Sequence, residues 1–459
     1  NYYFIGTDNN GNKYTTSARI NNLYGGNNEG GTTESTHIDL TKGTINNLYG
    51  GGNKAITKTT DVKIYNTTIL NAAFGGGNEA KVENANINLS SSTVGTPSTN
   101  GAVYGGGNNA EITQNVILNT DNNTIINGNV YGGGNLGAVL GIAKTTITDS
   151  KITSSIYGGG NKASVGTANN TNNNVVDLSI TNSESQNIYG GGNAAGVIGN
   201  TQTHITSSSI TDSIYGGGNG TDSIVPGDAT GEQNLAKING NVKLIVDEAT
   251  TANNIYGGGN LGMIVGSTDV TLKKSTVTSS IYGGGNAAIV NNNTYLLVSL
   301  STINNSVYAG GNGTTAIVKG NTNLDIENNT NITNHVFGGG NAAATGQTNI
   351  DNSTGIVNIS GATIGKNVYG GANTSVLYGI TTVNIGKNAV SNKNLITSNI
   401  TIGGTIFGGG EANASGSEIY DFNFISVTKG ININIDASEH QVFIINGSIF
   451  GSGNASSTS

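Results

Sequence analysis

The sequence predicts an all-β protein: a single parallel β-helix solenoid of about 15 coils. Three observations support this. A short aromatic–glycine motif recurs along the whole chain, apolar residues between its copies alternate with a period of two, and no segment keeps a helical period. We expect the coil to be right-handed, because parallel crossover connections almost always are.

Composition excludes several classes of protein. The chain has 459 residues, of which 73 are glycine, 2 are proline and none is cysteine. Glycine has no period of three and proline is scarce, which excludes collagen, and the lack of cysteine excludes a disulfide scaffold. Hydrophobic residues make up 34% of the chain and charged residues 10%, with a net charge of −8. Hydrophobic residues together with glycine make up about half of the chain, as is usual for a chain that folds, whereas the charged share is well below the usual ~25%. The chain is therefore not a disordered acidic one.

The distribution of charge and apolar residues also limits the partners. The lysines are scattered and Arg19 is the only arginine, so no positive stripe is available for phosphates, and we expect no nucleic-acid binding. No run approaches 18 apolar residues, so we expect no membrane insertion of this segment. Because the chain begins at Asn1 instead of Met, we expect a processed protein or an excised piece.

The repeat is a pentapeptide, Tyr/Phe-Gly-Gly-Gly-Asn, with 15 copies and occasional substitutions. The closest copies lie 25 to 27 residues apart. Such a period fits one coil of a β-helix, whereas a propeller blade takes about 40–45 residues and propellers close with about eight blades. The aromatic residues are Tyr24, Tyr49, Phe74, Tyr104, Tyr131, Tyr157, Tyr189, Tyr215, Tyr256, Tyr282, Tyr308, Phe337, Tyr369, Phe407 and Phe450.

The final position of the motif predicts a second column. It is asparagine in all copies but one, where Glu411 stands. Stacked amides can hydrogen-bond along a pile of strands, so we expect a structural ladder here. Its members are Asn53, Asn78, Asn108, Asn135, Asn161, Asn193, Asn219, Asn260, Asn286, Asn312, Asn341 and Asn373.

Two interpretations of the aromatic column remain open. The residue before each ring is aliphatic in every copy, with Ala73 the smallest, and should point into the core. Neighbours on a strand point to opposite faces, so the rings should lie outside or at a corner. They would then form either a stack packed against the glycine turn or an exposed stripe that binds a partner or a glycan.

Between the motifs the chain reads as short strands. Ile264, Val270 and Leu272 alternate with polar residues, and Lys273-Lys274-Ser275 interrupts the alternation. We expect residues 1–23 to be an N-terminal cap or the edge of a preceding region. Residues 24–459 should form one repeat domain with wider or looped coils at 216–255 and 370–450.

No constellation of catalytic residues is evident. The four histidines lie far apart in the repeat, and the outward carboxylates, such as Asp39, Asp61, Asp269 and Asp325, lie on coils that are mostly not adjacent. Residues 217–224 match a calcium-binding β-roll pattern once, without the neighbouring copies that such sites need. We therefore expect no enzymatic activity, no cofactor and no metal site.

The repeat style carries a resemblance. Runs such as Ser155-Ile156-Tyr157-Gly158-Gly159-Gly160-Asn161 and Asn187-Ile188-Tyr189-Gly190-Gly191-Gly192-Asn193 resemble the β-solenoid repeat regions of large cell-surface or adhesin-like proteins of Gram-positive anaerobic bacteria. The resemblance covers nearly the whole chain. It implies a secreted, surface or extracellular location and a solenoid architecture, and it transfers no functional residue.

Together these observations predict an extracellular structural or adhesive repeat protein that serves cell-surface display, adhesion or filament formation. Two alternatives stay open. One is a carbohydrate-binding or carbohydrate-active β-helix, whose ligand would be a glycan or a host or neighbouring-cell surface. The other is a fibre subunit that associates head to tail, because the last motif runs into Ala455 to Ser459 without an obvious polar cap.

Overall fold

The computed structural model describes residues 6–7, 13–14, 19–170, 172–220, 236–347, 352–386, 399–412, 427, 429–438 and 440–455. Parts of the expected N-terminal cap and of the two looped regions therefore lie outside the described residues. The chain divides into two compact units, residues 1–211 with 218–240 and residues 212–217 with 241–459. Apart from the 3-10 turn η1 (Ala168–Asn170), the regular elements of the described residues are all strands.

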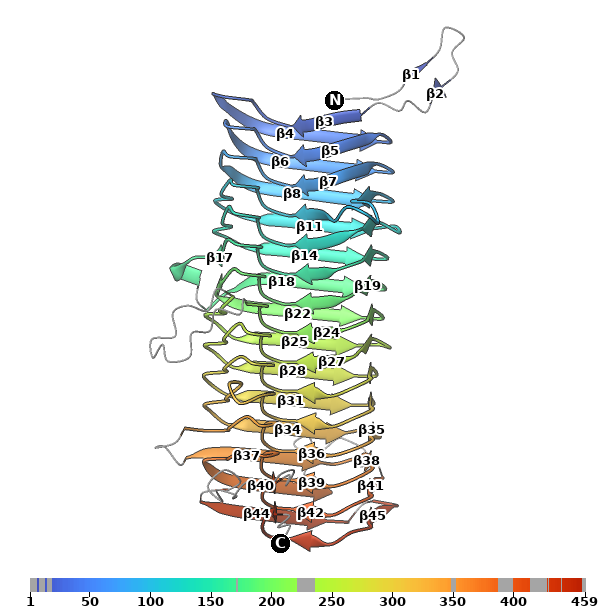
Figure 1. Ribbon diagram of the computed structural model, residues 1–459, viewed down its shortest axis with the longest axis vertical. Coiled ribbons are helices and arrows are strands. Elements are labelled where there is room, and N and C mark those ends of the chain that lie inside the picture. The colour runs from blue at the N-terminus through green and yellow to red at the C-terminus, as the bar shows by residue number, and fades with distance from the viewer. Residues whose placement is uncertain are drawn as a thin grey trace. The chain divides into compact units, whose positions relative to one another are not determined.

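In the first unit, parallel strands stack into two walls (Figure 1). The wide wall has seven strands: β4 (Thr32–Thr41), β6 (Ile56–Tyr65), β8 (Val82–Ser90), β11 (Val116–Asp121), β14 (Ala143–Thr148), β18 (Asn174–Thr181) and β22 (Asn200–Thr206). The opposite, narrow wall has β3 (Arg19–Tyr24), β5 (Thr44–Tyr49) and β7 (Thr68–Phe74), then β9 (Thr93–Val94), β10 (Gly101–Tyr104), β12 (Ile125–Ile126), β13 (Gly128–Tyr131), β15 (Lys151–Ile152), β16 (Ser155–Tyr157), β19 (Glu184–Ser185), β20 (Asn187–Tyr189) and β23 (Ser209–Ile210).

The second unit repeats this plan. Its wide wall has β25 (Val242–Asp247), β28 (Thr268–Lys273), β31 (Thr294–Ser299), β34 (Thr322–Glu327), β37 (Ser353–Ile359), β40 (Gly379–Gly386) and β44 (Gly430–Asp436). Its narrow wall has β24 (Ser213–Tyr215), β26 (Thr251–Ala252), β27 (Asn254–Tyr256), β29 (Thr276–Val277), β30 (Ile281–Tyr282), β32 (Thr302–Ile303), β33 (Val307–Tyr308), β35 (Thr330–Ile332), β36 (Val336–Phe337), β38 (Ala362–Ile364), β39 (Val368–Tyr369), β41 (Ile400–Ile402), β42 (Ile406–Phe407), β45 (Phe443–Ile445) and β46 (Ile449–Phe450).

Between the glycine motif and the next wide strand, a third side closes each coil. Single parallel bridges join its apolar residues from coil to coil, as between Val82 and Ile112 and between Ile112 and Val139. Two short pairs extend it: β17 (Val165–Gly166) with β21 (Val197–Ile198), and β43 (Glu411–Ala412) with β47 (Asn454–Ala455). A separate antiparallel pair joins β1 (Gly6–Thr7) and β2 (Lys13–Tyr14).

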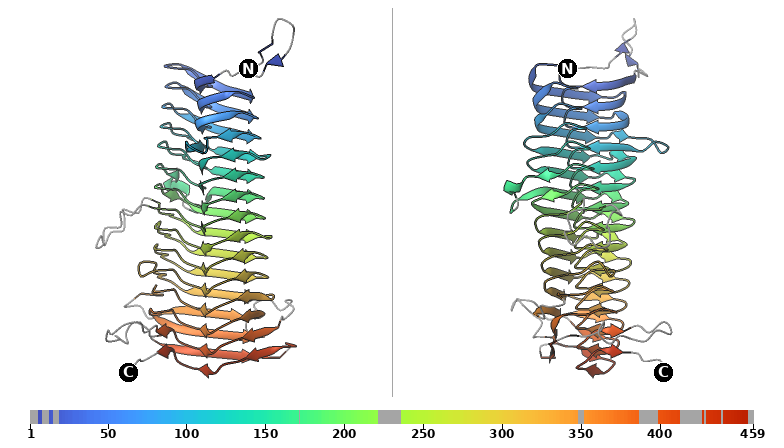
Figure 2. Two further views of the ribbon diagram at one scale, coloured as in Figure 1. Left: turned by 45° about the vertical axis from the view of Figure 1, so that its right-hand side comes forward. Right: turned by 60° about the vertical axis from the view of Figure 1, so that its left-hand side comes forward.

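The register explains the core. Each wide strand pairs in parallel with the equivalent residues of the next coil, as Ile64 does with Leu89. Because side chains alternate along a strand, every second residue points inward and forms an aliphatic column along the stack. Ile38, Val62 and Ile87, for example, are all at most 2% exposed. Figure 2 shows this stacking from two further sides. The predicted all-β parallel β-helix is confirmed, while its handedness stays a prediction.

Candidate functional site

The motif rings form continuous stacks. In the first unit, neighbouring rings from Tyr24 to Tyr189 lie 4.7–5.0 Å apart between centroids and within 8° of parallel. In the second unit the stack runs from Tyr215 to Phe450 with centroid distances of 4.7–5.4 Å. Stacked aromatic pairs contribute roughly 0.5–1.5 kcal/mol beyond the burial of their surface. The stack therefore adds cohesion at every step from coil to coil.

The rings are buried, which removes the exposed-stripe interpretation. From Tyr49 to Phe407 the motif aromatics are between 0% and 8% exposed, and only Tyr24 and Phe450 at the two ends show more surface. Each ring is the last residue of its strand, where the chain turns at the first motif glycine. The ring is therefore enclosed at a corner, and strand alternation does not send it into solvent. Its column does not offer a ligand surface.

Burial also changes the acidity of the phenols. Desolvation raises the pKa of Tyr104 to about 12, and the pKa of Tyr308 also rises to about 12, chiefly by desolvation. The pKa values of Tyr131 and Tyr256 are raised for the same main reason. A phenolate in this column would be poorly solvated, so the folded coils favour the neutral ring.

The motif asparagines form hydrogen-bonded columns. Each side-chain amide donates from Nδ2 to the Oδ1 of the preceding coil at 2.7–2.9 Å, from Asn53 to Asn219 in the first unit and from Asn286 to Asn373 in the second. Every amide in the middle of a column thus donates once and accepts once along the stack. Where another residue replaces one asparagine, the Oδ1 atom of the preceding asparagine loses its hydrogen-bond donor.

Glu411 makes such a break. The backbone of Glu411 forms a parallel β-bridge with Asn373, the preceding member of the column. Its carboxylate, however, accepts a hydrogen bond from the Tyr369 hydroxyl at 2.8 Å. A carboxylate cannot donate to the amide oxygen before it, and the buried Asn373 Oδ1 has no hydrogen-bond partner. The substitution noted in the sequence therefore has a local energetic cost in the second unit.

A third column, of hydroxyl groups, was missed by sequence reasoning. From β6 to β34, ten wide strands end in a corner with positive φ, followed by a buried Ser or Thr whose hydroxyl bonds a carbonyl two or three residues back at 2.7–3.0 Å. Gly43 and Ala362 take the equivalent position after β4 and β37. The hydroxyl also accepts the backbone N–H of the preceding coil, as Ser183 does from Ser150 at 3.1 Å. The column comprises Thr67, Ser92, Thr124, Ser150, Ser183, Ser208, Thr250, Ser275, Ser301 and Thr330. Aligning the repeats on this Ser/Thr, instead of on the motif, would have revealed it.

Among the described coils, three corners are one residue longer than the others. They hold two consecutive residues with positive φ: Asn122-Asn123, Glu248-Ala249 and Asn328-Asn329. In each of them the hydroxyl column is continued by threonine, which bonds the carbonyl three residues back at 2.7–2.8 Å. The longer corner places one more side chain at the edge of the coil.

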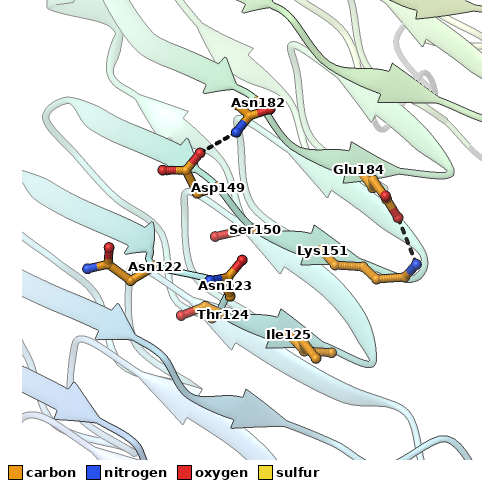
Figure 3. Close-up of a pocket in the computed structure, with 9 residues that line it drawn as sticks. All are labelled: Asn122, Asn123, Thr124, Ile125, Asp149, Ser150, Lys151, Asn182 and Glu184. Carbon is orange, nitrogen blue, oxygen red and sulfur yellow. Dashed lines mark hydrogen bonds and ion pairs between the residues drawn. The ribbon is translucent and has the colours of Figure 1, made fainter.

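The first of these longer corners borders a surface groove in the first unit (Figure 3). The groove has a volume of about 410 Å³. One wall is formed by the corner residues of three successive coils, Asn122-Asn123, Asp149 and Asn182. The other wall is formed by the residues two positions after each corner, Ile125, Lys151 and Glu184. The buried hydroxyl column lies between them. The lining residues are Asn122, Asn123, Thr124, Ile125, Asp149, Ser150, Lys151, Asn182 and Glu184.

Hydrogen bonds and an ion pair hold the walls of the groove. Asn182 donates to Asp149 at 2.5 Å, and Lys151 contacts Glu184 at 2.7 Å (Figure 3). Ile125 is 39% exposed and gives the wall an apolar stretch. The groove thus combines amides, carboxylates, an ammonium group and an aliphatic surface within one concave site.

One ionic cluster lies on the wide wall of the first unit. The His37 ring lies 2.9 Å from Asp39 and 2.9 Å from Asp61, and Lys63 lies 3.4 Å from Asp61. Asp39 and Asp61 therefore stand on adjacent coils. Their side chains are 46% and 35% exposed, so solvent screens these pairs strongly. Within the described ranges, no group of three or more His, Cys, Asp or Glu residues could hold a metal ion.

Part of the calcium-like pattern at 217–224 lies outside the described residues, from 221 onward. No helix in the part of the chain that the structure describes is long and apolar enough to cross a membrane. Comparison with known proteins gives no match to a family model, to a curated protein or to a solved structure.

Proposed function

We propose that this protein is an extracellular structural or adhesive element whose stacked coils act as a stiff spacer for display at a cell surface. The observation that carries the proposal is the buried ring stack, which continues through every described coil of each unit. Together with the amide and hydroxyl columns, it makes most coils bind their neighbours through the same kinds of contact. A stiff spacer needs such coil-to-coil cohesion.

The contrast between inward and outward columns supports the same role. Most inward positions of the wide wall stay aliphatic from coil to coil, whereas one outward column of this wall changes from His37 to Asp61, Asn86, Ile117 and Lys144. On the wide wall, the repeat therefore preserves the core contacts more strictly than this outer surface. This pattern fits a scaffold better than a repeated binding face.

The location is tested by labelling intact cells of the source organism with antibodies against the purified protein. Surface labelling that disappears after brief external proteolysis, together with weaker cell attachment when the gene is deleted, is the expected result. Antigen that becomes accessible only after lysis would overturn the proposal.

A second candidate is head-to-tail assembly, favoured by the last described coil of the second unit. Ile435, Ile449 and Phe450 are 37%, 48% and 49% exposed. Their register partners one coil earlier, Ile385, Ile406 and Phe407, are between 0% and 8% exposed. Among the described residues, the strands β44, β45 and β46 of this coil pair only with the coil before them. The outer edge of such a coil can accept the first coil of a second copy in a heterologous contact that does not close.

Sedimentation velocity over a range of concentrations tests this candidate. Assembly should grow with concentration and disappear in Phe450→Asp, which places a charge on the exposed ring position. Tyr65→Asp is the matched control, because Tyr65 is also an exposed ring, at 53%, but lies on β6 in the first unit. A monomer at every concentration would exclude the fibre subunit and leave the spacer.

A further inference from the structure

The residues of the groove depart from the repeat's own consensus. The register of the narrow wall defines an outward column that is threonine at eight positions: Thr44, Thr68, Thr93, Thr251, Thr276, Thr302, Thr363 and Thr401. Ser209 and Asn331 are also small and polar, whereas Arg19 and Ile444 occupy the first and last described positions of the column. Inside the first unit the column changes to Ile125, Lys151 and Glu184 on three consecutive coils. These same three coils form the groove.

The departure does not serve the fold of the coil. Thr93 pairs with Ile125 and Glu184 pairs with Ser209 in the same parallel register, so threonine or serine suits this position on the flanking coils. The three larger side chains instead build a wall beside the hydroxyl column. A local change that adds a concave surface without a need of the fold points to a ligand.

The charges in the groove favour an uncharged ligand. The carboxylate of Glu184 pairs with the ammonium of Lys151, and the carboxylate of Asp149 accepts the Asn182 amide. One positive and two negative groups leave a net charge of −1, which disfavours phosphate and other anions. Among the residues described, the acidic side chains of the groove make no metal-binding group.

The remaining groups suit hydroxyls on a partly apolar ring. Asn123 is exposed, and its side-chain amide can both donate and accept. The carboxylates of Asp149 and Glu184 can accept, and the Lys151 ammonium can donate. Ile125 offers an aliphatic surface against which the C–H face of a sugar can pack. The volume of about 410 Å³ is near the lower end of the range for ligand pockets, enough for one or two sugar residues.

We propose that this groove on the first unit binds a neutral oligosaccharide, with Asn123 and Asp149 bonding hydroxyls and Ile125 packing against the sugar ring. The inference does not depend on the spacer role or on assembly. It would give the protein a specific glycan contact on the side of the solenoid, away from the buried rings.

Saturation-transfer NMR and calorimetry of the full chain with maltotriose, cellotriose and chitotriose test this inference. At least one of them should bind with a millimolar or lower Kd, and Asn123→Ala and Asp149→Ala should each weaken binding by about tenfold, the effect of one lost hydrogen bond. Asn123→Ala should fold, because Ala249 already occupies the same corner position with φ 63°, close to 61° at Asn123.

Asn329→Ala is the matched control. Asn329 has the same corner conformation, with φ 59°, but the outward residue beside it is the small Asn331. This variant should bind as the parent does. Absence of binding to all three sugars, equal loss in Asn329→Ala, or stabilisation by calcium chloride in place of sugar would each overturn the inference.

Discussion

Three threonines place hydroxyl groups in aliphatic columns of the core. Thr145 and Thr203 continue the column of Leu118 and Leu178, and Thr345 continues that of Val318. All three are at most 1% exposed, and their hydroxyls have no hydrogen-bond partner. A buried hydroxyl without a partner costs about 1–3 kcal/mol. These positions are local weak points of the two units.

Thr145→Val should therefore raise the free energy of unfolding by about 1–2 kcal/mol, because valine has the same shape and leaves no polar atom unpaired. Urea denaturation followed by circular dichroism measures the change. Thr268→Val is the matched control, since the Thr268 hydroxyl bonds the Gly283 carbonyl at 2.6 Å. That control should lose stability, and a loss in both variants would contradict the explanation.

The amide column allows a second test at this scale. Glu411→Asn should restore a donor to Asn373 Oδ1 and stabilise the second unit by about 1–3 kcal/mol, the cost of an unsatisfied buried acceptor. The reverse change, Asn341→Asp, removes the donor to Asn312 and should destabilise the same unit by a similar amount. Thermal melts of both variants check this. Opposite signs are required, and a stabilising Asn341→Asp would refute the ladder's contribution.

At the scale of the structural element, the glycine turn is limited by the neighbouring coil. The second motif glycine is conserved within every repeat except the last, where Ser452 stands. A Cβ atom at Gly258 would lie 2.8 Å from the backbone nitrogen of Gly285, closer than real side chains approach. The exception, Ser452, lies in a coil against which no later described coil packs.

Gly258→Ala should destabilise the second unit by about 1–3 kcal/mol, since the coil must shift to admit the methyl group. Ser452→Ala should change stability by less than about 0.5 kcal/mol, as expected for a surface position. Chemical denaturation measures the free energy of unfolding of the two variants. It compares the same motif position where a later coil packs against it and where no later described coil does. Equal effects would contradict the steric explanation.

The ring stack predicts a transition at alkaline pH. Because burial raises the pKa of Tyr104 and Tyr308 to about 12 from an unfolded value near 10, the unfolded chain loses its protons first as the pH rises. The stability that the neutral rings provide is fully present below pH 10 and is lost between about pH 10 and 12. Phenolate absorbance should rise together with loss of circular dichroism. Gradual phenolate formation with an intact fold would contradict the buried stack.

Much of the fold follows from the sequence at this scale. The 15 copies of the motif and the alternation between them are enough to predict stacked parallel strands, because each motif marks one coil. The rings were harder to place. Strand alternation predicts an outward or corner ring, and only the structure shows that the turn at the first glycine encloses it. The groove could not be predicted, because its walls belong to three coils whose register is fixed by corners of different length.

At the scale of the whole molecule, cohesion between coils is the dominant property. Each coil is joined to its neighbours by ring stacking and backbone pairing, and at most steps within each unit also by amide and hydroxyl hydrogen bonds. Stability in such repeat proteins is approximately a sum of nearest-neighbour terms. Under load, the coils should therefore detach one or a few at a time.

Force spectroscopy of the full chain, held at its two ends, tests this cohesion most directly. We expect a series of force peaks. Their contour-length increments should be multiples of about 90 Å, from ~26 residues per coil at ~3.5 Å each. Extension without peaks at low force would contradict a spacer built from cohesive stacked coils.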